Sequence, residues 1–299
     1  MKGIKSTRQV TKAMELVAAS KMRRAVSNAV TLRRFALASW HILLRVSKRN
    51  PESHAALRPR PVQKVLGILF TSDRGLTGSM GTQILKSAAE YIESLQKIPT
   101  FASMDFIAVG RRGQNFLARA GQNVIAAFPA FSNHPKLRDI APVAKIAADA
   151  FAAGTYDHVT LLYPDFISAL AQKPTAKVLL PFSQTALTEM MKSLGVDPGS
   201  VRSEAELHMP EGNAQYLFEP SEAVVLDAAL SQITELQIYQ ALLEAVASEH
   251  SARMVAMRSA TDNATAILDD LTLTYNQTRQ GNITSELAEL SASKAALEG

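Results

Sequence analysis

Apolar residues in the last third of the chain recur at alternating steps of three and four. This 3.5-residue average is the period of a coiled coil. Neither glycine nor proline interrupts the stretch from Ser221 to Gln280, so it is open to one long helix. Pro220 followed by Ser221, a good N-cap residue, is typical of a helix start. The repeat consists of Leu236, Tyr239, Leu243, Val246, Met257, Ala260, Ala264, Ile267 and Leu271.

A second window without glycine or proline runs from Ile4 to Asn50. A helix of this length is not stable on a single amphipathic stripe and needs a partner along most of its length. The simplest arrangement is an antiparallel coiled coil of the two windows. The looser apolar stripe of the first window consists of Met14, Val17, Met22, Val26, Val30, Phe35, Trp40 and Leu44.

Two positions of the C-terminal seam are polar, His250 and Arg253. Polar residues at seam positions set the register of a coiled coil or open it locally. A contact with something outside the chain explains them equally well. Both interpretations stay open from the residues alone.

Between the two windows, short apolar runs alternate with helical stripes, which predicts an α/β domain with a largely parallel sheet. One helical stripe is Ile84, Ala88, Ile92 and Leu95; another is Ile140, Val143, Ala147 and Phe151; Gly110 and Gly121 bracket a shorter helix. Residues 183–215 are polar and predict a loose connection with one short helix near Glu189–Leu194. The expected strands are Leu66–Phe70, Phe106–Val109, Val124–Phe128, Val159–Tyr163 and Val178–Phe182.

The predicted fold is therefore a long antiparallel coiled coil of the N- and C-terminal helices with an inserted Rossmann-like α/β domain. We expect three parts: an N-terminal helix over 1–58, the α/β domain over 59–215 and a C-terminal helix over 216–299.

Composition adds limits to this picture. The chain has 299 residues, 47% of them hydrophobic and 20% charged, with no cysteine. The lack of cysteine excludes disulfides and thiol catalysis and fits a reducing compartment. No 18-residue run lacks charge, so we expect no membrane-spanning helix. The segment Met1–Met22 is basic and lacks a central apolar block, so we do not expect it to be a secretory signal.

Charge is distributed unevenly along the chain. Residues 1–50 hold twelve basic residues and one acid, whereas residues 221–299 hold four basic residues and eleven acids. The two ends attract each other or find separate charged partners. A basic front of this kind is also compatible with an arm that binds nucleic acid or an anionic membrane surface.

The strongest candidate for chemistry is the segment Thr71–Gly81, TSDRGLTGSMG, which follows a predicted strand and precedes a predicted helix. Phosphate loops occupy such places. However, the segment lacks the Gly-Lys-Ser/Thr ending and the G-x-G-x-x-G pattern. A tight turn with glycines at positive φ explains it as well. The six histidines are scattered, and the pair Asp269-Asp270 points in two directions on a helix, so we expect no metal site, no catalytic residue and no bound cofactor.

Four segments in order along the chain resemble the γ subunit family of F-type ATP synthases. They are Thr11–Met22 (TKAMELVAASKM), the turn Thr71–Gly81 with its core SDRGL, Ser248–Asn263 (SEHSARMVAMRSATDN) and Tyr275–Leu287 (YNQTRQGNITSEL). The first and third are highly specific, and together the four span nearly the whole chain.

The resemblance implies a non-catalytic central shaft in the F1 part of the enzyme. Its partners would be three α and three β subunits, the ε subunit and the membrane c ring. Proton flow would turn the c ring and the shaft, whose asymmetric surface would drive ATP synthesis on the β subunits; ATP hydrolysis would run the motor backwards. The shaft would lie at the cytoplasmic face of a bacterial plasma membrane, without inserting into it and without binding nucleic acid.

The resemblance also implies contact residues. Lys21, Arg23 and Arg24 are expected to face an acidic loop of the β subunits, and Met22 is expected to contact the α/β subunits beside them. By their places in the motifs, Arg253, Arg279, Gln280 and Thr284 are expected to contact the α/β collar.

Three features depart from the family pattern. Family members have a longer segment before the first motif, so we expect truncation or a downstream start. Gly281 stands where the family has a helix former, and the tail carries Lys294 and Glu298 instead of small apolar residues. The lack of cysteine argues against the plant chloroplast form. Two other functions stay open from the residues: a basic coiled-coil protein that binds nucleic acid, and a nucleotide-dependent enzyme that uses the Thr71–Gly81 turn.

Overall fold

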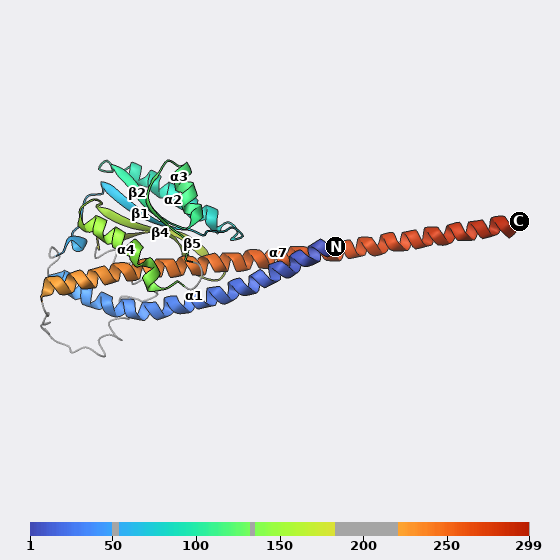
Figure 1. Ribbon diagram of the computed structural model, residues 1–299, viewed down its shortest axis with the longest axis horizontal. Coiled ribbons are helices and arrows are strands. Elements are labelled where there is room, and N and C mark those ends of the chain that lie inside the picture. The colour runs from blue at the N-terminus through green and yellow to red at the C-terminus, as the bar shows by residue number, and fades with distance from the viewer. Residues whose placement is uncertain (50–53, 132–134, 183–220, 299) are drawn as a thin grey trace.

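Two long terminal helices pair in opposite directions, and an α/β domain lies against one side of the pair (Figure 1). The computed structural model describes residues 1–49, 54–131, 135–182 and 221–298. Helix α1 spans Lys2–Arg49 and helix α7 spans Glu222–Glu298. At the start of α7, the Ser221 hydroxyl accepts a hydrogen bond from the amide of Val224. The predicted antiparallel pairing of the termini around an inserted α/β domain is confirmed.

The α/β domain is built on a five-stranded sheet in the order β3-β2-β1-β4-β5. Its first four strands are parallel, and β5 pairs antiparallel with β4 as a hairpin. In chain order the elements are η1 (Ala55–Leu57), β1 (Lys64–Phe70), α2 (Met80–Gln96), β2 (Ser103–Val109), α3 (Arg111–Arg119), β3 (Asn123–Phe128), α4 (Leu137–Ala152), β4 (His158–Phe166) and β5 (Gln172–Leu180).

Strand β1 is buried on both faces, which explains its continuous apolar sequence. Leu66, Ile68 and Phe70 point into a core shared with α4 and α7. Val65 and Leu69 point into a second core, formed with α2 and with Leu117 of α3. Both helical stripes predicted for α2 and α4 are buried. The long helix α7 is thus part of the core of the α/β domain as well as half of the coiled coil.

The last strand was predicted with the wrong bounds, and only Val178–Leu180 is common to both. We expected Val178–Phe182, whereas β5 runs from Gln172 to Leu180. Its first half carries few large apolar residues because it is an edge strand that pairs only with β4, from Phe166 opposite Gln172 onward. The predicted helix near Glu189–Leu194 lies outside the described residues. The division into 1–58, 59–215 and 216–299 stays a prediction.

The stripe predicted for α1 was wrong in part. Val17 is 55% exposed and Val30 49% exposed, whereas the buried side chains of this helix are small: Thr11, Ala18, Ala25 and Ala29. Thr11, Ala18 and Ala25 are seven residues apart, so they follow the coiled-coil period more closely than the larger residues do. Small side chains let two helix backbones approach closely, and bulk alone placed Val17 and Val30 in the seam, each one position from the buried Ala18 and Ala29. Phe35, Trp40 and Leu44 have side chains outside the described set.

Most of the predicted α7 seam is buried, including Leu236, Leu243, Met257 and Ala264. The C-terminal end of this seam was predicted wrongly, since Ile267 and Leu271 are exposed. Thr261 pairs with Thr11, so Leu271 lies level with the first residues of α1, and α7 then continues beyond the end of α1 (Figure 1). Among the described residues, none of the helices has the length and hydropathy needed to cross a membrane.

Tyr156 makes the stability of the α/β domain depend on pH in the alkaline range. Its hydroxyl donates a hydrogen bond to Oδ2 of Asp105 at 2.7 Å. Burial, followed by this bond and the Asp105 charge, raises the pKa of Tyr156 to about 12. An unfolded tyrosine has a pKa of about 10, so between these values the unfolded chain releases a proton that the folded chain keeps.

We therefore expect the free energy of unfolding to fall as pH rises above about 10, by up to about 1.4 kcal/mol per pH unit from this residue. Thermal melting between pH 8 and pH 11 tests this in the wild type and in Tyr156→Phe, which lacks the titrating hydroxyl. The variant should lose less stability over that interval. Parallel losses in both chains would contradict the assignment.

Candidate functional site

The turn after β1 is held in place by the neighbouring strand-to-helix loop. The amide of Thr71 donates to the carbonyl of Val109 at 2.8 Å, and the Thr71 hydroxyl accepts a hydrogen bond from the amide of Gly113 at 2.8 Å. Gly110 has a φ of +101° and lies directly against Thr71. A glycine is required there, because any Cβ would stand 2.1 Å from the carbonyl oxygen of Thr71.

Asp73 organises the same turn. Its Oδ1 accepts a hydrogen bond from the amide of Arg111 at 2.9 Å, and both carboxylate oxygens lie 3.2 Å from the amide of Ala130. The first amide of α3, where an anion would bind, is therefore satisfied by a carboxylate of the chain itself. Within the described residues, no group of three or more histidine or acidic side chains is arranged to hold a metal ion.

Three of the four motif segments meet at one cleft of about 610 Å³. Helix α1 contributes Met14 and Lys21, the turn contributes Asp73 to Leu76, and α7 contributes Glu249, His250 and Arg253. The motifs that lie far apart in the sequence are thus adjacent in space. We call this the motif cleft.

Arg253 connects two sides of the motif cleft. Its Nη2 is 2.8 Å from Oε1 of Glu249, one turn earlier in α7, and the two side chains are only 14% and 9% exposed. The same nitrogen reaches the carbonyl of Gly75 at 3.4 Å, and Nη1 lies 3.4 Å from Nδ1 of His250. The two polar seam residues that the sequence left ambiguous therefore interact within the chain, and Arg253 connects α7 to the turn after β1.

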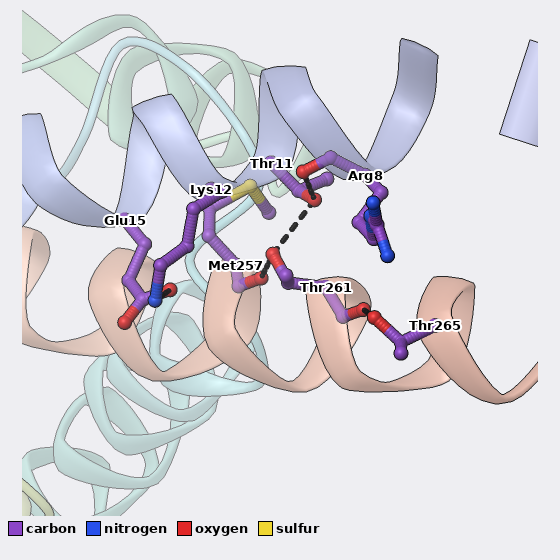
Figure 2. Close-up of polar contacts among 7 residues, drawn as sticks. All are labelled: Arg8, Thr11, Lys12, Glu15, Met257, Thr261 and Thr265. Carbon is purple, nitrogen blue, oxygen red and sulfur yellow. Dashed lines mark hydrogen bonds and ion pairs between the residues drawn. The ribbon is translucent and has the colours of Figure 1, made fainter. Parts of the chain in front are cut away.

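The coiled coil below the motif cleft contains a polar pair in its seam (Figure 2). The hydroxyl oxygens of Thr11 and Thr261 are 2.7 Å apart, one from each helix. Within its own helix, the Thr11 hydroxyl lies 3.1 Å from the carbonyl oxygen of Arg8. The Thr261 hydroxyl lies 2.8 Å from the carbonyl oxygen of Met257. A paired polar contact of this kind favours a single register between the helices.

The expected contact residues fall into two groups. Lys21 and Met22 are half-buried beside the motif cleft, and Arg23 and Arg24 are exposed on the next turn of α1. Arg253 lies on the opposite side of the same cleft. The structure therefore brings Lys21 and Arg253 together, and the predicted roles of all five toward partner subunits stay predictions.

The second group lies far from the motif cleft. Arg279, Gln280 and Thr284 are exposed on the part of α7 that extends beyond α1. The Thr284 hydroxyl donates to the carbonyl of Gln280 at 2.9 Å, one turn earlier. The helix continues through Gly281, so this glycine does not break it. Contact of these residues with partner subunits also stays a prediction.

Sequence reasoning missed two residues that shape this region. Asp73 was part of a motif, but its role toward α3 depends on a loop that comes almost forty residues later. Glu244 was not singled out, although it is a lone acid in the apolar run from Ala241 to Ala247. A single charged residue at a position that should be buried is the signal that would have indicated it.

Comparison with known proteins agrees with this arrangement. A family model described as ATP synthase matches residues 1–297. The ATP synthase gamma chain of Roseiflexus castenholzii is 40% identical over 301 residues, which cover 99% of this chain and 96% of the relative. That of Herpetosiphon aurantiacus is 37% identical over 306 residues, with the same coverage. No support comes from these relatives for a nucleic-acid-binding protein.

Solved structures show the same fold. A chain of the central stalk and c-ring structure of the Tetrahymena thermophila mitochondrial ATP synthase superimposes with a TM-score of 0.59 at 25% identity, covering 84% of this chain and 99% of that one. The match covers 84% of this chain, which is more than the terminal helices or the α/β domain alone. The protein described here belongs to the ATP synthase γ-chain family.

Proposed function

We propose that this chain is the central rotor shaft of an F1Fo ATP synthase. The proposal rests on the asymmetric shape of the chain. Two terminal helices pair over a long distance, and the α/β domain lies on one side of them only (Figure 1). A shaft that turns inside a ring of like subunits must present a different face to each of them. An asymmetric rod of paired helices meets this requirement.

In this proposal the α/β domain and the adjoining coil sit on the membrane c ring and hold the ε subunit. The coil enters a ring of three α and three β subunits, and proton-driven rotation presses each β subunit through its conformations. The chain itself catalyses nothing and holds no cofactor. The assembly would be peripheral, at the cytoplasmic face of a bacterial plasma membrane.

The contact residues fit this arrangement by position and charge. Lys21, Arg23 and Arg24 give one stretch of α1 a positive charge suited to an acidic loop of β. Arg279, Gln280 and Thr284 lie on the exposed end of α7, where the collar of the ring would surround it. That exposed end carries several large apolar side chains, including Leu273, Ile283, Leu287 and Leu290, which suit an apolar bearing.

Reconstitution with α and β subunits tests the proposal. We expect a stable complex of three α, three β and one copy of this chain, with ATPase activity above that of α and β alone. A truncated chain that ends before Tyr275 is the matched control and should bind more weakly. If the full chain stays unassembled with α and β subunits of a related bacterial enzyme, the proposal is wrong.

A further inference from the structure

One face of α7 is both polar and buried. Glu244, Ser248 and Ser251 are exposed by only 6%, 0% and 0%, and they follow one another at steps of four and three residues. That spacing places all three on one side of the helix. Polar side chains in such a position cost stability unless they are bonded, and apolar residues of similar size would stabilise the contact more.

Glu244 faces the α/β domain. The hydroxyl of Tyr163 on β4 lies beside its carboxylate, and Nε2 of Gln240 donates a hydrogen bond to Oε1 at 2.9 Å. Burial, with the nearby Glu244 charge, raises the pKa of Tyr163, so the hydroxyl keeps its proton as a donor. Burial lowers the pKa of Lys177 on β5, and the nearby negative charge of Glu244 opposes this lowering.

Ser251 is bonded to the far end of the same hairpin. Its hydroxyl donates to the carbonyl of Ala169, in the turn between β4 and β5, and Nε2 of Gln172 donates to its Oγ at 3.3 Å. Ser248, between the two bonded positions, has no hydrogen-bond partner within the described residues. The hairpin thus meets α7 at two polar points, Glu244 and Ser251, about 10 Å apart along the helix.

We propose that Glu244 is a positioning residue, which together with Ser251 fixes the axial and rotational register of the α/β domain on the shaft helix. Apolar ridges and grooves allow neighbouring registers one turn apart. A buried carboxylate does not, because a shifted Glu244 would stay buried but lose the Tyr163 hydroxyl, its polar neighbour on the α/β domain. The inference rests on the proposed function, since torque between the α/β domain and the coil passes through this contact.

Distances between spin labels test the register directly in the full chain. The chain has no cysteine, so Lys86→Cys on α2 and Ser259→Cys on α7 provide unique labelling sites. The variants to compare are Glu244→Leu, which removes the acceptor, Glu244→Gln, which keeps one, and Tyr163→Phe, which removes the donor from the other side. Asp269→Leu, the same kind of change at an exposed position of α7, is the matched control.

We expect one narrow distance distribution in the wild type, in Glu244→Gln and in the control. Glu244→Leu and Tyr163→Phe should broaden it or add a population displaced by about 5 Å, one helical turn. Distributions like that of the wild type in both variants would overturn the inference. If Glu244→Leu does not fold, Tyr163→Phe, which loses a single hydroxyl, decides the outcome.

Coupling in the reconstituted F1Fo complex gives an independent readout. We expect Glu244→Leu to hydrolyse ATP but to pump severalfold fewer protons per ATP, and Glu244→Gln to restore the ratio. A residue that only stabilises the fold would lower the yield of complex and leave that ratio unchanged. A wild-type chain that does not assemble would refute the proposed function, whereas equal coupling in wild type and Glu244→Leu would refute only this inference.

Discussion

Replacement of Gly110 by alanine is expected to destabilise the α/β domain by about 3 kcal/mol or more. The new Cβ would stand 2.1 Å from the carbonyl oxygen of Thr71 and 2.7 Å from its carbonyl carbon, and these are backbone atoms that cannot move aside. The φ of +101° adds strain for any residue with a Cβ. Relief requires the Thr71 turn to separate from the loop before α3. Thermal melting followed by circular dichroism should show a large fall in midpoint.

Gly121→Ala is the matched control. This glycine has a φ of +67°, and its added Cβ would meet nothing within 4 Å among the described atoms. Only the backbone strain remains, so we expect a loss of about 1 kcal/mol. Equal losses in the two variants would show that the close approach to Thr71 contributes nothing, which would contradict the account of the turn.

Replacement of Ala25 by aspartate is expected to open the coiled coil. Ala25 is 4% exposed in the seam between α1 and α7, and a short charged side chain there cannot reach water without separating the helices. We expect a loss of about 3 kcal/mol or more in the free energy of unfolding. Urea denaturation followed by the fluorescence of Trp40, the single tryptophan of the chain and part of α1, measures it.

Val30→Asp tests the alternative placement of the seam. Both substitutions introduce the same residue into α1, so the helix propensity of aspartate is common to them. Because Val30 is 49% exposed, we expect its variant to lose about 1 kcal/mol or less. A larger loss from Val30→Asp than from Ala25→Asp would support the stripe of bulky residues and contradict the seam of small ones.

The order of elements was predictable because each depends on local signals. The absence of glycine and proline marked both long helices, and short apolar runs marked the first four strands. The seam of α1 was not predictable, because Ala18, Ala25 and Ala29 carry little hydrophobic signal by themselves. They are buried only because the partner helix lies close to them. Strand β5 was misplaced because its edge position permits polar residues that resemble a loop.

The candidate site was predictable in part. The motif segments indicated which residues converge, and the structure places three of them around one cleft. The bonds of Arg253 to Glu249 and Gly75 were not predictable, because they depend on how the turn after β1 meets α7. The contact of Tyr163 with Glu244 joins residues 81 positions apart, and spacing alone does not report such pairs.

Rotation of this chain against a fixed ring of α and β subunits tests the central claim most directly. A probe attached through Lys86→Cys, on the exposed side of α2, would report the motion of the α/β domain. We predict that ATP drives continuous rotation of the probe in one direction, and that rotation stops when ATP is removed. ATP hydrolysis by a complex in which the probe does not turn would contradict the claim that this chain is the shaft.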